Sequence, residues 1–439
     1  MQANFIRENF TMKNFFILNG RVLDPSQNLD KKINIEIRNG KIYKFFSNKI
    51  KNIDSLNHID AKGFIVSPGF IDLHVHLRDP GLTHKETIGS GSKAAAFGGF
   101  TSIACMPNTS PPNDNPKITN YIMKKSKRDS LVKIYPIGAI TKGQDGKSLA
   151  KIKENIHAGC IGISDDGFPV TNSSLLYEAM NMAKDLQVPL ISHCEECSLS
   201  KNGVINEGFV SRKNNLPGIP NISEELGILR DIFISDFTGC HLHICHVSTE
   251  GSVKIIKDAK GRGSNITCEA APHHFTLSEK DIDIKNSNFK MNPPLRSDKD
   301  KKAIIDGLKD GTIDIIATDH APHAKKEKKT GFLKAPFGII GLETALPLSL
   351  NLVRNKKITM MNLIKKLSFI PARIAKIEAG SLKKGNFADI TIFDPNEKFN
   401  YSENLINSKS KNSPLINKFL QGKVKYTFVN GNLIYDDRK

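Results

Sequence analysis

The sequence of 439 residues is long enough for one large enzyme domain with a smaller companion, or for two to three average domains. Its formal net charge of +18 comes from dispersed lysines among abundant Asn and Ile, the pattern of an AT-rich genome, and no DNA or RNA recognition motif accompanies it. The dispersed charge therefore argues against a nucleic-acid partner. No apolar run approaches the roughly 20 residues that span a bilayer, which argues against a membrane location.

Seven cysteines are scattered through the chain, mostly within apolar runs. An odd number in such positions is typical of reduced thiols in a cytoplasmic protein rather than of a disulfide framework. Cys194 and Cys197 have the CxxC spacing, but no second CxxC completes a structural zinc site, so we interpret this pair as incidental.

The N-terminal part of the chain predicts a short extension followed by β-strands. We interpret residues 1–11 as the extension and residues 12–66 as the first part of a small β-domain. The stretches FFILNGRVLD and INIEIRNGKIYKFF alternate apolar and polar residues, and the pairs Asn19-Gly20 and Asn39-Gly40 predict hairpin turns.

Residues 67–377 contain eight apolar, strand-like segments with helix-like segments between them. The segments are 69–73, 100–106, 132–140, 160–164, 188–192, 240–245, 265–270 and 313–318. Near-continuous apolar strands that alternate with helices are typical of a parallel sheet covered by helices. Eight such units predict an α/β fold of the TIM (β/α)8 barrel type, and a doubly wound sheet, which usually has fewer strands, is the alternative.

Residues 378–439 return to the short-strand style of the N-terminal part. ADITIFD and YTFVNGNLIYDD read as strands, with Asn430-Gly431 as a further hairpin turn. Two β-rich ends on either side of the barrel predict one small β-sandwich built from both ends of the chain.

Histidines and acids are concentrated where the predicted barrel strands end. His74 and His76 follow the first strand, and because side chains at i and i+2 point to one face, their imidazoles project together. The other strand ends carry Asp165 and Asp166, His193, His246, and the group Asp319, His320 and His323. A lone histidine is more often a hydrogen-bonded core residue, but this convergence at the catalytic face of a barrel predicts a metal centre.

The mixture of imidazole and carboxylate suits Zn²⁺, Mn²⁺ or Fe²⁺, with zinc the default for hydrolysis. Enough ligands converge for two metals that share a bridging hydroxide, which indicates metal-assisted hydrolysis. His241 and His243 lie within the sixth strand and are interpreted as packing residues, and His273 and His274 receive no ligand role.

Seven short motifs occur in a fixed order along the chain. They are DLHVHLRDPG (72–81), MPNT (106–109), SDDG (164–167), SHCE (192–195), HVST (246–249), NPPLR (292–296) and TDHAPH (318–323). In these motifs the sequence resembles the amidohydrolase superfamily and, within it, type I dihydroorotases, over residues 13–436.

The resemblance implies a set of metal ligands. His74, His76 and Asp319 would bind the more buried metal, and His193 and His246 the other. Many members of the superfamily bridge the two metals with a carboxylated lysine, but no lysine occurs between Lys153 and Lys184. The resemblance therefore assigns the bridge to Asp166, with Asp165 in support.

For the substrate, the resemblance implies the reversible cyclisation of N-carbamoyl-L-aspartate to L-dihydroorotate in pyrimidine biosynthesis. A bridging hydroxide would attack the ring amide while Asp319 carries its proton to the departing nitrogen. The residues implied in substrate binding are His76, Arg78, Asn108, Asn292, His323 and the backbone of Phe337 and Gly338. The lysine-rich segment 325–338 is interpreted as a mobile lid.

Two other functions are weighed against this one. A hydantoinase or allantoinase would use the lysine bridge and lack the pairing of Arg78 with Asn108. A noncatalytic relative that scaffolds aspartate transcarbamoylase would lose metal ligands, whereas every one is present here. As partners we expect a small-molecule substrate, a second copy in a homodimer and, as in some relatives, aspartate transcarbamoylase.

Overall fold

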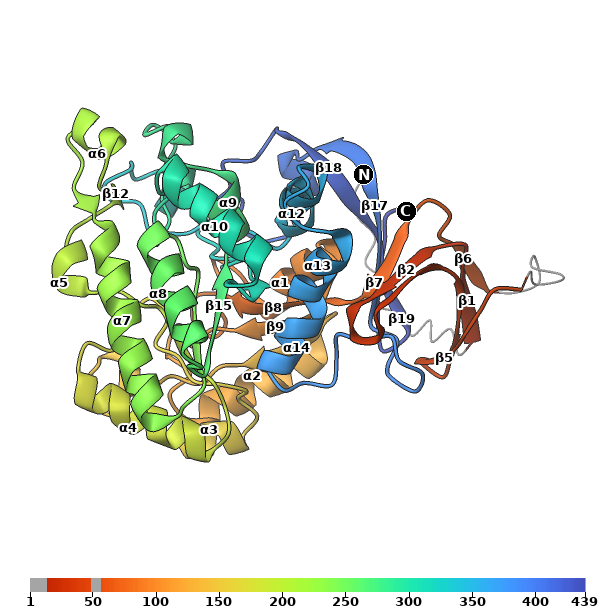
Figure 1. Cartoon of the computed structure of the whole chain (residues 1–439), viewed down its shortest axis with the longest axis horizontal. Coiled ribbons are helices and arrows are strands. Elements are labelled where there is room, and N and C mark those ends of the chain that lie inside the picture. Colours follow the sequence, from red (N-terminus) through yellow and green to blue (C-terminus); the bar gives the residue numbers. More distant parts are fainter. Residues whose placement is uncertain (1–13, 49–56, 439) are drawn as a thin grey trace.

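The computed structural model describes residues 14–48 and 57–438, so the extension predicted for residues 1–11 lies outside the described residues. Sheets built from the two chain ends lie on one side of the molecule, and a larger body of strands and helices lies on the other (Figure 1). Within the described ranges, no helix is both long and apolar enough to cross a bilayer.

The large body is an α/β structure built on parallel strands. One sheet has the order β10 (Lys133–Pro136), β9 (Phe100–Cys105) and β8 (Phe70–Val75). A second has the order β11 (Leu190–Ser192), β14 (Leu242–Ile244), β15 (Ile266–Ala270) and β16 (Ile315–Ile316). Every pairing in both sheets is parallel, as the near-continuous apolar runs predict.

Single bridges connect the two sheets at both margins. Ile163 pairs with Gly138 beyond β10 and with Leu190 of β11, and His320 beyond β16 pairs with Val75 of β8. The pairings therefore lead around the body and back to the strand where they begin.

Seven of the eight predicted strand segments contain a strand, and the fourth is wrong as a strand. In segment 160–164 only Ile163 forms bridges. Gly162 packs so closely that a Cβ there would lie 3.1 Å from the carbonyl oxygen of Pro189. Directly after Ser164 the chain leaves the sheet, and Asp165 and Asp166 follow.

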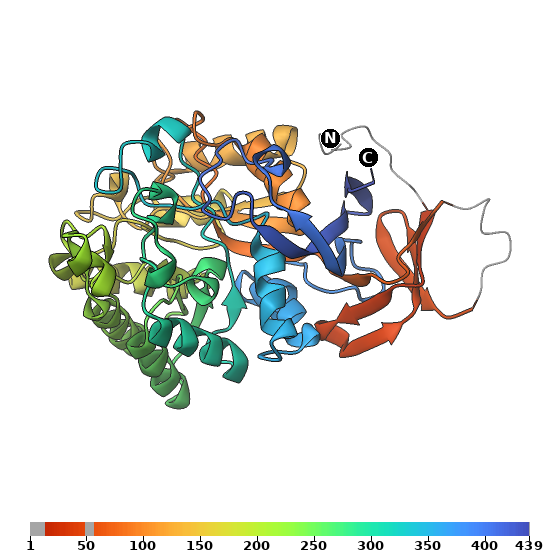
Figure 2. The ribbon, with the colours of Figure 1, turned by 90° about the horizontal axis from the view of Figure 1, so that it is seen from above.

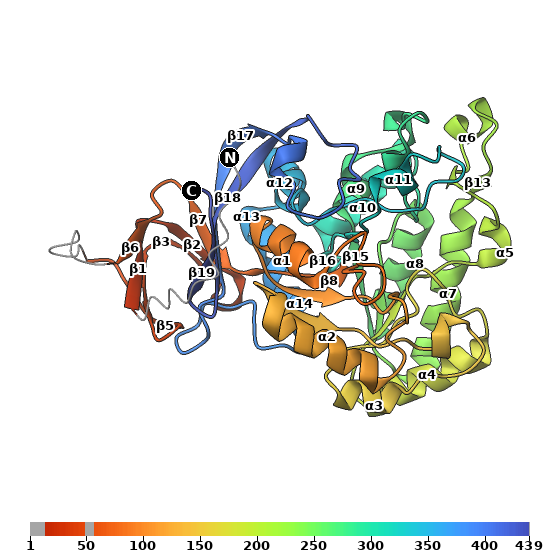
Figure 3. The same ribbon diagram turned by 180° about the vertical axis from the view of Figure 1, so that it is seen from behind.

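Helices follow the strands and cover the outside of the body (Figures 1 and 3). The longer ones are α1 (Ile88–Phe97), α2 (Pro116–Asp129), α4 (Ser173–Asp185), α7 (Asn221–Thr238), α8 (Glu250–Gly261), α10 (Asp298–Asp310) and α12 (Ala345–Arg354). The shorter elements are α3 (Ile152–His157), α5 (Cys197–Ser200), β12 (Ile205–Asn206), α6 (Phe209–Lys213), β13 (Gly218–Ile219), α9 (Pro272–Thr276), α11 (Lys325–Lys328), α13 (Met360–Ile364) and α14 (Ile370–Ile374).

The chain ends form two further sheets. The four-stranded sheet has the order β5 (Lys41–Phe46), β4 (Asn34–Arg38), β1 (Asn14–Leu18) and β6 (His58–Asp60). The six-stranded sheet has the order β19 (Asn432–Asp436), β18 (Phe419–Val429), β17 (Ile390–Asn400), β7 (Ile65–Pro68), β2 (Arg21–Asp24) and β3 (Leu29–Lys32). Strands from opposite ends of the chain thus lie side by side (Figure 2).

One apolar core joins these two sheets. Phe15 of β1 stacks on Phe428 of β18 with ring centroids 5.1 Å apart. Ile35 from the smaller sheet and Ile392 from the larger one are fully buried in the same cluster. Each sheet therefore covers the apolar face of the other.

Two of the three predicted hairpin turns are confirmed, and one is wrong. Asn39-Gly40 and Asn430-Gly431 have positive φ at both positions and connect antiparallel strands. Asn19-Gly20 instead links β1 to β2, which belong to different sheets, and Gly20 keeps a negative φ. Here glycine serves close packing, because a Cβ at Gly20 would lie 2.5 Å from Cγ2 of Val66.

Candidate metal centre

The carboxyl ends of the strands bring six predicted ligands together in the buried interior. In two clusters the potential ligand atoms lie within 4.8 Å of one another. These clusters are His74, His76 and Asp319, and Asp166, His193 and His246.

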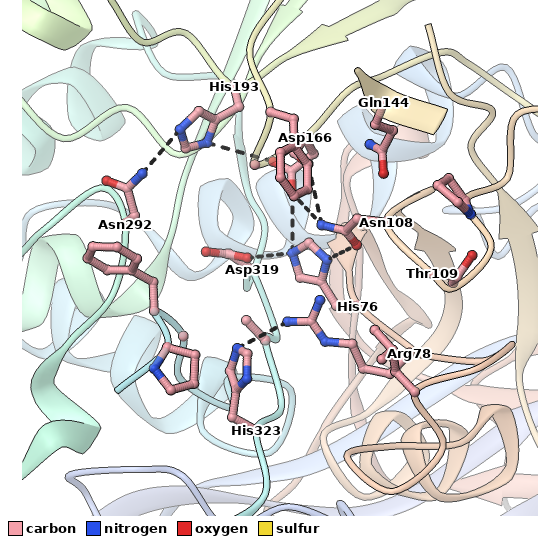
Figure 4. Close-up of a pocket in the computed structure, with 18 of the residues that line it drawn as sticks. His76, Arg78, Asn108, Thr109, Gln144, Asp166, His193, Asn292, Asp319 and His323 are labelled. Atoms are coloured by element: carbon pink, nitrogen blue, oxygen red, sulfur yellow. Dashed lines mark hydrogen bonds and ion pairs between the residues drawn. The ribbon is translucent and has the colours of Figure 1, made fainter. Parts of the chain in front are cut away.

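Asp166 lies among four imidazoles, and Figure 4 shows it between two of them, those of His76 and His193. Its Oδ1 is 3.3 Å from Nε2 of His74, 3.7 Å from Nε2 of His246 and 3.8 Å from Nδ1 of His193. Its Oδ2 is 3.4 Å from Nε2 of His76. A carboxylate with both oxygens among ring nitrogens can contact two cations at once.

Asp319 lies on the other side of the first histidine pair. Its Oδ1 is 3.0 Å from Nε2 of His76 and 3.5 Å from Nε2 of His74. The arrangement places one acid from the end of the last strand beside both histidines of the first strand, as the resemblance implied.

Two buried polar atoms in this cluster have no hydrogen-bond partner among the described residues, namely Nε2 of His74 and Oδ1 of Asp166. Buried polar atoms are normally paired, and these two face each other at 3.3 Å. An imidazole nitrogen and a carboxylate oxygen are both ligands of divalent cations. The residues present therefore fit a metal ion.

The charges around Asp166 also favour a cation. Burial by itself would raise the pKa of Asp166, but the neighbouring imidazoles, His74 foremost, hold this pKa well below its usual value. Burial opposes charge on His74 too, yet the surrounding carboxylates raise the pKa of His74 well above its usual value. The site thus attracts positive charge, which a metal ion can supply in place of protons.

Three acids that the sequence analysis gave no role support the ligands. Glu269 of β15 lies with Oε1 2.7 Å from Nδ1 of His74, and Glu195 lies with Oε2 2.8 Å from Nε2 of His193. Asp72 accepts hydrogen bonds from the backbone amides of His74 and Thr318. The sequence contains one signal that could have revealed Glu269: it is an acid inside the otherwise apolar strand ITCEA.

Cys245 is a further neighbour that the sequence did not single out. Its sulfur forms a third potential ligand group with His74 and Asp166. Burial raises the pKa of the Cys245 thiol far above its usual value, so the side chain stays protonated and uncharged.

The remaining histidines lie outside the two clusters. His241 and His243 both contact the hydroxyl of Thr267, at 2.9 and 2.8 Å, as their interpretation as packing residues predicts. His243 also contacts Glu269 through Nε2 at 3.1 Å and so supports the centre indirectly. His320 turns away from the centre, since its Nδ1 accepts the backbone amide of Gly341 at 3.1 Å.

A cavity of about 500 Å³ opens above the ligands. Every residue predicted to bind substrate lines it, namely His76, Arg78, Asn108, Asn292, His323, Phe337 and Gly338. Gln144, Thr109 and Phe168 line it as well, and the sequence analysis missed them.

Arg78 is the buried cation of this cavity. Its side chain contacts the carbonyl oxygen of Pro322 and Nε2 of His323, at 3.3 and 3.4 Å, and forms no ion pair with a carboxylate in the part of the chain that the structure describes. Burial and the charges of Arg78 and Lys85 lower the pKa of His323 to about 2, so His323 is neutral and can accept from the guanidinium. The free guanidinium edge suits an anionic group in the cavity.

Three site residues have left-handed backbones, at φ values of 58° for Arg78, 30° for His246 and 47° for Asp319. Residues other than glycine rarely adopt this region, and strained backbone is often concentrated at functional sites. Each of these residues lies two or three positions after the end of a strand, so the turn there aims its side chain into the site.

Comparisons with known sequences agree with this geometry. A family model described as Dihydro-orotase-like matches residues 63–252. A dihydroorotase of Geotalea daltonii is 48% identical over 422 residues, which cover 96% of this chain and 99% of the relative. A dihydroorotase of Trichlorobacter lovleyi is 47% identical over 425 residues, which cover 97% of this chain and 100% of the relative.

Solved structures share the fold at much lower identity. An L-hydantoinase (dihydropyrimidinase) from Arthrobacter aurescens has a TM-score of 0.84 and 23% identity, covering 97% of this chain and 96% of its own. A dihydropyrimidinase from Brevibacillus agri has a TM-score of 0.82 and 22% identity over the same shares. These likenesses concern the fold.

Replacing Glu269 by Gln is expected to weaken zinc binding by about 10- to 100-fold, because the amide cannot hold the His74 ring with the same charge-assisted contact. Zinc affinity is measured by competition with a chelator, and bound zinc is counted by mass spectrometry. Glu343→Gln is the matched control, since Glu343 is an equally buried acid that contacts Tyr401 instead. Unchanged zinc affinity in Glu269→Gln would contradict a supporting role.

Proposed function

The chain belongs to the dihydroorotase family, and we propose that its buried metal centre catalyses the reversible cyclisation of N-carbamoyl-L-aspartate to L-dihydroorotate in pyrimidine biosynthesis. The observation that carries the proposal is that Asp166, which lies among four histidines, lines the same cavity as Arg78, a buried cation without an ion-pair partner among the described residues. A metal-ligating set and an anion-binding group thereby share one cavity.

We propose that the large body is a TIM barrel and that the sheets of the chain ends form a β-sandwich. The parallel pairings that lead back to β8 and the shared core of the two terminal sheets support this assignment. The corresponding division into 67–377 for the barrel and 12–66 with 378–439 for the sandwich stays a prediction.

We propose two zinc ions as the resident metals. His74, His76 and Asp319 would hold one, His193 and His246 the other, and Asp166 would contact both. When bound, such ions lower the pKa of a coordinated water and draw charge from a carbonyl oxygen. The absence of any lysine between Lys153 and Lys184 leaves a carboxylate as the bridge.

The cavity walls orient the substrate. Arg78 offers two parallel N–H groups to the α-carboxylate, and Asn108 lies beside it, with its Oδ1 2.8 Å from Nδ1 of His76. On the opposite wall, Asn292 and the backbone of Phe337 and Gly338 face the same cavity. Substrate held between these walls has its ring amide above the metal ligands.

Asp319 is the proposed proton carrier. In ring opening it takes the proton of the attacking water and delivers it to the ring nitrogen as the C–N bond breaks. In cyclisation it takes the proton from the carbamoyl nitrogen and returns it to the departing water oxygen. Its place at the mouth of the centre, 3.0 Å from His76 and lining the cavity, suits this transfer.

The other functions fit the residues less well. A hydantoinase-type activity would need a lysine bridge. The structural likeness to hydantoinases concerns the fold alone. A noncatalytic scaffold would not need all six candidate ligands or a lined cavity. A cytoplasmic location and an association with aspartate transcarbamoylase stay predictions from the sequence.

We propose that the homodimer forms through the outer face of α7. Along this helix five apolar side chains are exposed at spacings of three and four residues: Ile222, Leu226, Leu229, Phe233 (60%) and Phe237 (79%). Tyr177 of α4 adjoins the stripe, with its ring centroid 6.0 Å from that of Phe237. The helix lies at the edge of the molecule away from the terminal sheets (Figures 1 and 3).

The partner that fits this stripe is a second copy of the chain. Two α7 helices that cross about a two-fold axis near Leu229 would place the aromatic end of each stripe against the aliphatic end of the other. The exposed apolar area is on the order of 500 Å² per copy, so a pair buries about 1,000 Å², where specific interfaces begin.

Asp319→Asn is expected to fold, retain at least one metal and lose nearly all activity in both directions, because the amide cannot accept the proton. General acid–base catalysis is typically worth about 10²- to 10⁴-fold in rate. The rate of each direction is measured on protein of verified metal content. A fully metallated variant with more than about a tenth of wild-type activity would rule out this role.

Arg78→Ala is expected to raise the KM for dihydroorotate by about 10- to 100-fold, because a charge-assisted hydrogen bond worth about 1.5 to 3 kcal/mol is lost. Its metal content should equal that of the wild type. Arg78→Lys should recover part of the affinity, since a single ammonium cannot reproduce the two parallel N–H groups of the guanidinium. Normal substrate binding, or loss of metal, in Arg78→Ala would show that the assigned role is wrong.

Phe233→Arg is expected to convert the dimer into a monomer, because it places a charge within the α7 stripe, next to its centre at Leu229. Sedimentation velocity gives the mass in solution, and circular dichroism checks that the fold is kept. Phe419→Arg is the control, since Phe419 is an aromatic residue on β18 that is even more exposed, at 81%. A monomeric wild type, or a dimeric Phe233→Arg variant, overturns the assignment.

A further inference from the structure

One wall of the substrate cavity is a loop that has little regular structure of its own. Residues 331–338 follow α11 and contribute Pro336, Phe337 and Gly338 to the cavity. If the backbone of Phe337 and Gly338 contacts the substrate ring, something must hold this loop in place.

Lys328 contacts this loop from beneath. Only 5% of the residue is exposed, and its Nζ donates to three carbonyl oxygens: Pro336 at 2.9 Å, Gly338 at 3.0 Å and Lys290 at 3.1 Å. An ammonium has three hydrogens, so every donor is used. One buried side chain thereby ties the loop to the segment that leads, two residues later, to Asn292.

Lys290 makes a second tie between the same two segments. It is 3% exposed, its Nζ donates to the carbonyl oxygen of Leu333 at 2.8 Å, and it lies 4.6 Å from the centroid of the Phe337 ring. The backbone amide of Gly338 also donates to the carbonyl oxygen of Lys290 at 3.0 Å. The loop is therefore fixed at Leu333, Pro336, Phe337 and Gly338.

Neither ammonium has a carboxylate partner among the residues that the structure places. Burying an amine without a counter-ion is unfavourable, and burial lowers the pKa of Lys328 to about 7 and that of Lys290 to about 8. Their position directly behind the cavity wall suggests a role in function.

We propose that Lys328 and Lys290 are positioning residues that set the specificity of the cavity for its ring substrate by fixing the backbone of Phe337 and Gly338. The inference rests on the proposed function, since it assumes that these backbone groups meet the dihydroorotate ring. The two segments of this wall, one that leads to Asn292 and one that contains Gly338, are then held at a fixed separation by one ammonium.

A second anchor limits the size of the expected effect. Asn412 donates from Nδ2 to the carbonyl oxygens of Gly338 and Ala321, at 3.1 and 2.9 Å. Gly338 would therefore keep one partner when Lys328 is lost, whereas the carbonyl of Pro336 has no other side-chain donor in the described chain. Loss of Lys328 should loosen the loop without detaching it.

The test is Lys328→Met, which keeps an unbranched side chain and removes all three donors. We expect the KM for dihydroorotate to rise at least about fivefold, while kcat and metal content stay within about twofold of wild type. The loop contacts bind the ground state and the transition state of the substrate alike, so their loss weakens binding without slowing the chemical step. A purely structural role would lower thermal stability and leave the KM of the folded fraction unchanged.

Lys366→Met is the matched control. Lys366 is also 5% exposed and also donates from Nζ to backbone carbonyls, those of Ile313 and Asp314, but these two partners do not line the cavity. This variant should lose stability with an unchanged KM. The comparison separates positioning of the loop from the general cost of removing a buried lysine.

The outcomes distinguish this proposal from the proposed function. Wild-type protein that does not turn over dihydroorotate contradicts the function itself. Active Lys328→Met enzyme with a KM within twofold of wild type overturns the positioning role alone. If Lys328→Met does not fold, Lys290→Met in the same assay decides, and an unchanged KM there also overturns the proposal.

Discussion

The burial of two carboxylates among four histidines is the constraint on which the rest of this structure depends. Asp166 and Asp319 lie largely buried among ring nitrogens at 3.0–3.8 Å, below the cavity that they help to line. Such a cluster is unstable unless its charges are balanced and its geometry is held. Parallel strands meet both needs, because their carboxyl ends converge and their interior supplies supporting acids such as Glu269.

The support extends outward in layers. Glu269 orients His74, and His243 in turn contacts Glu269, so three strands fix one imidazole. Asp165, next to the central carboxylate, accepts the backbone amides of Ile140 and Thr141 and so anchors its own turn. The left-handed backbones at His246 and Asp319 persist because this network holds them.

Much of this arrangement was predictable from the sequence, because the relevant signals are local. Apolar runs indicated the strands, and the histidines and acids directly after them indicated the centre. The failures have long-range causes. Asn19-Gly20 looks like a hairpin turn, but its strands join different sheets whose partners are distant in sequence. Glu269 gained its role only from His74 and His243 on other strands, and segment 160–164 pairs through one residue because its glycine packs against a neighbouring strand.

The six-stranded sheet of the chain ends has a consequence for biosynthesis. β7, which directly precedes the first strand of the large body, pairs with β17, more than 300 residues later. While the ribosome makes the intervening chain, the edge of β7 and apolar side chains such as Val66 lack their final cover. The emerging protein therefore exposes this edge until its last strands are translated, a period in which it can pair with other chains.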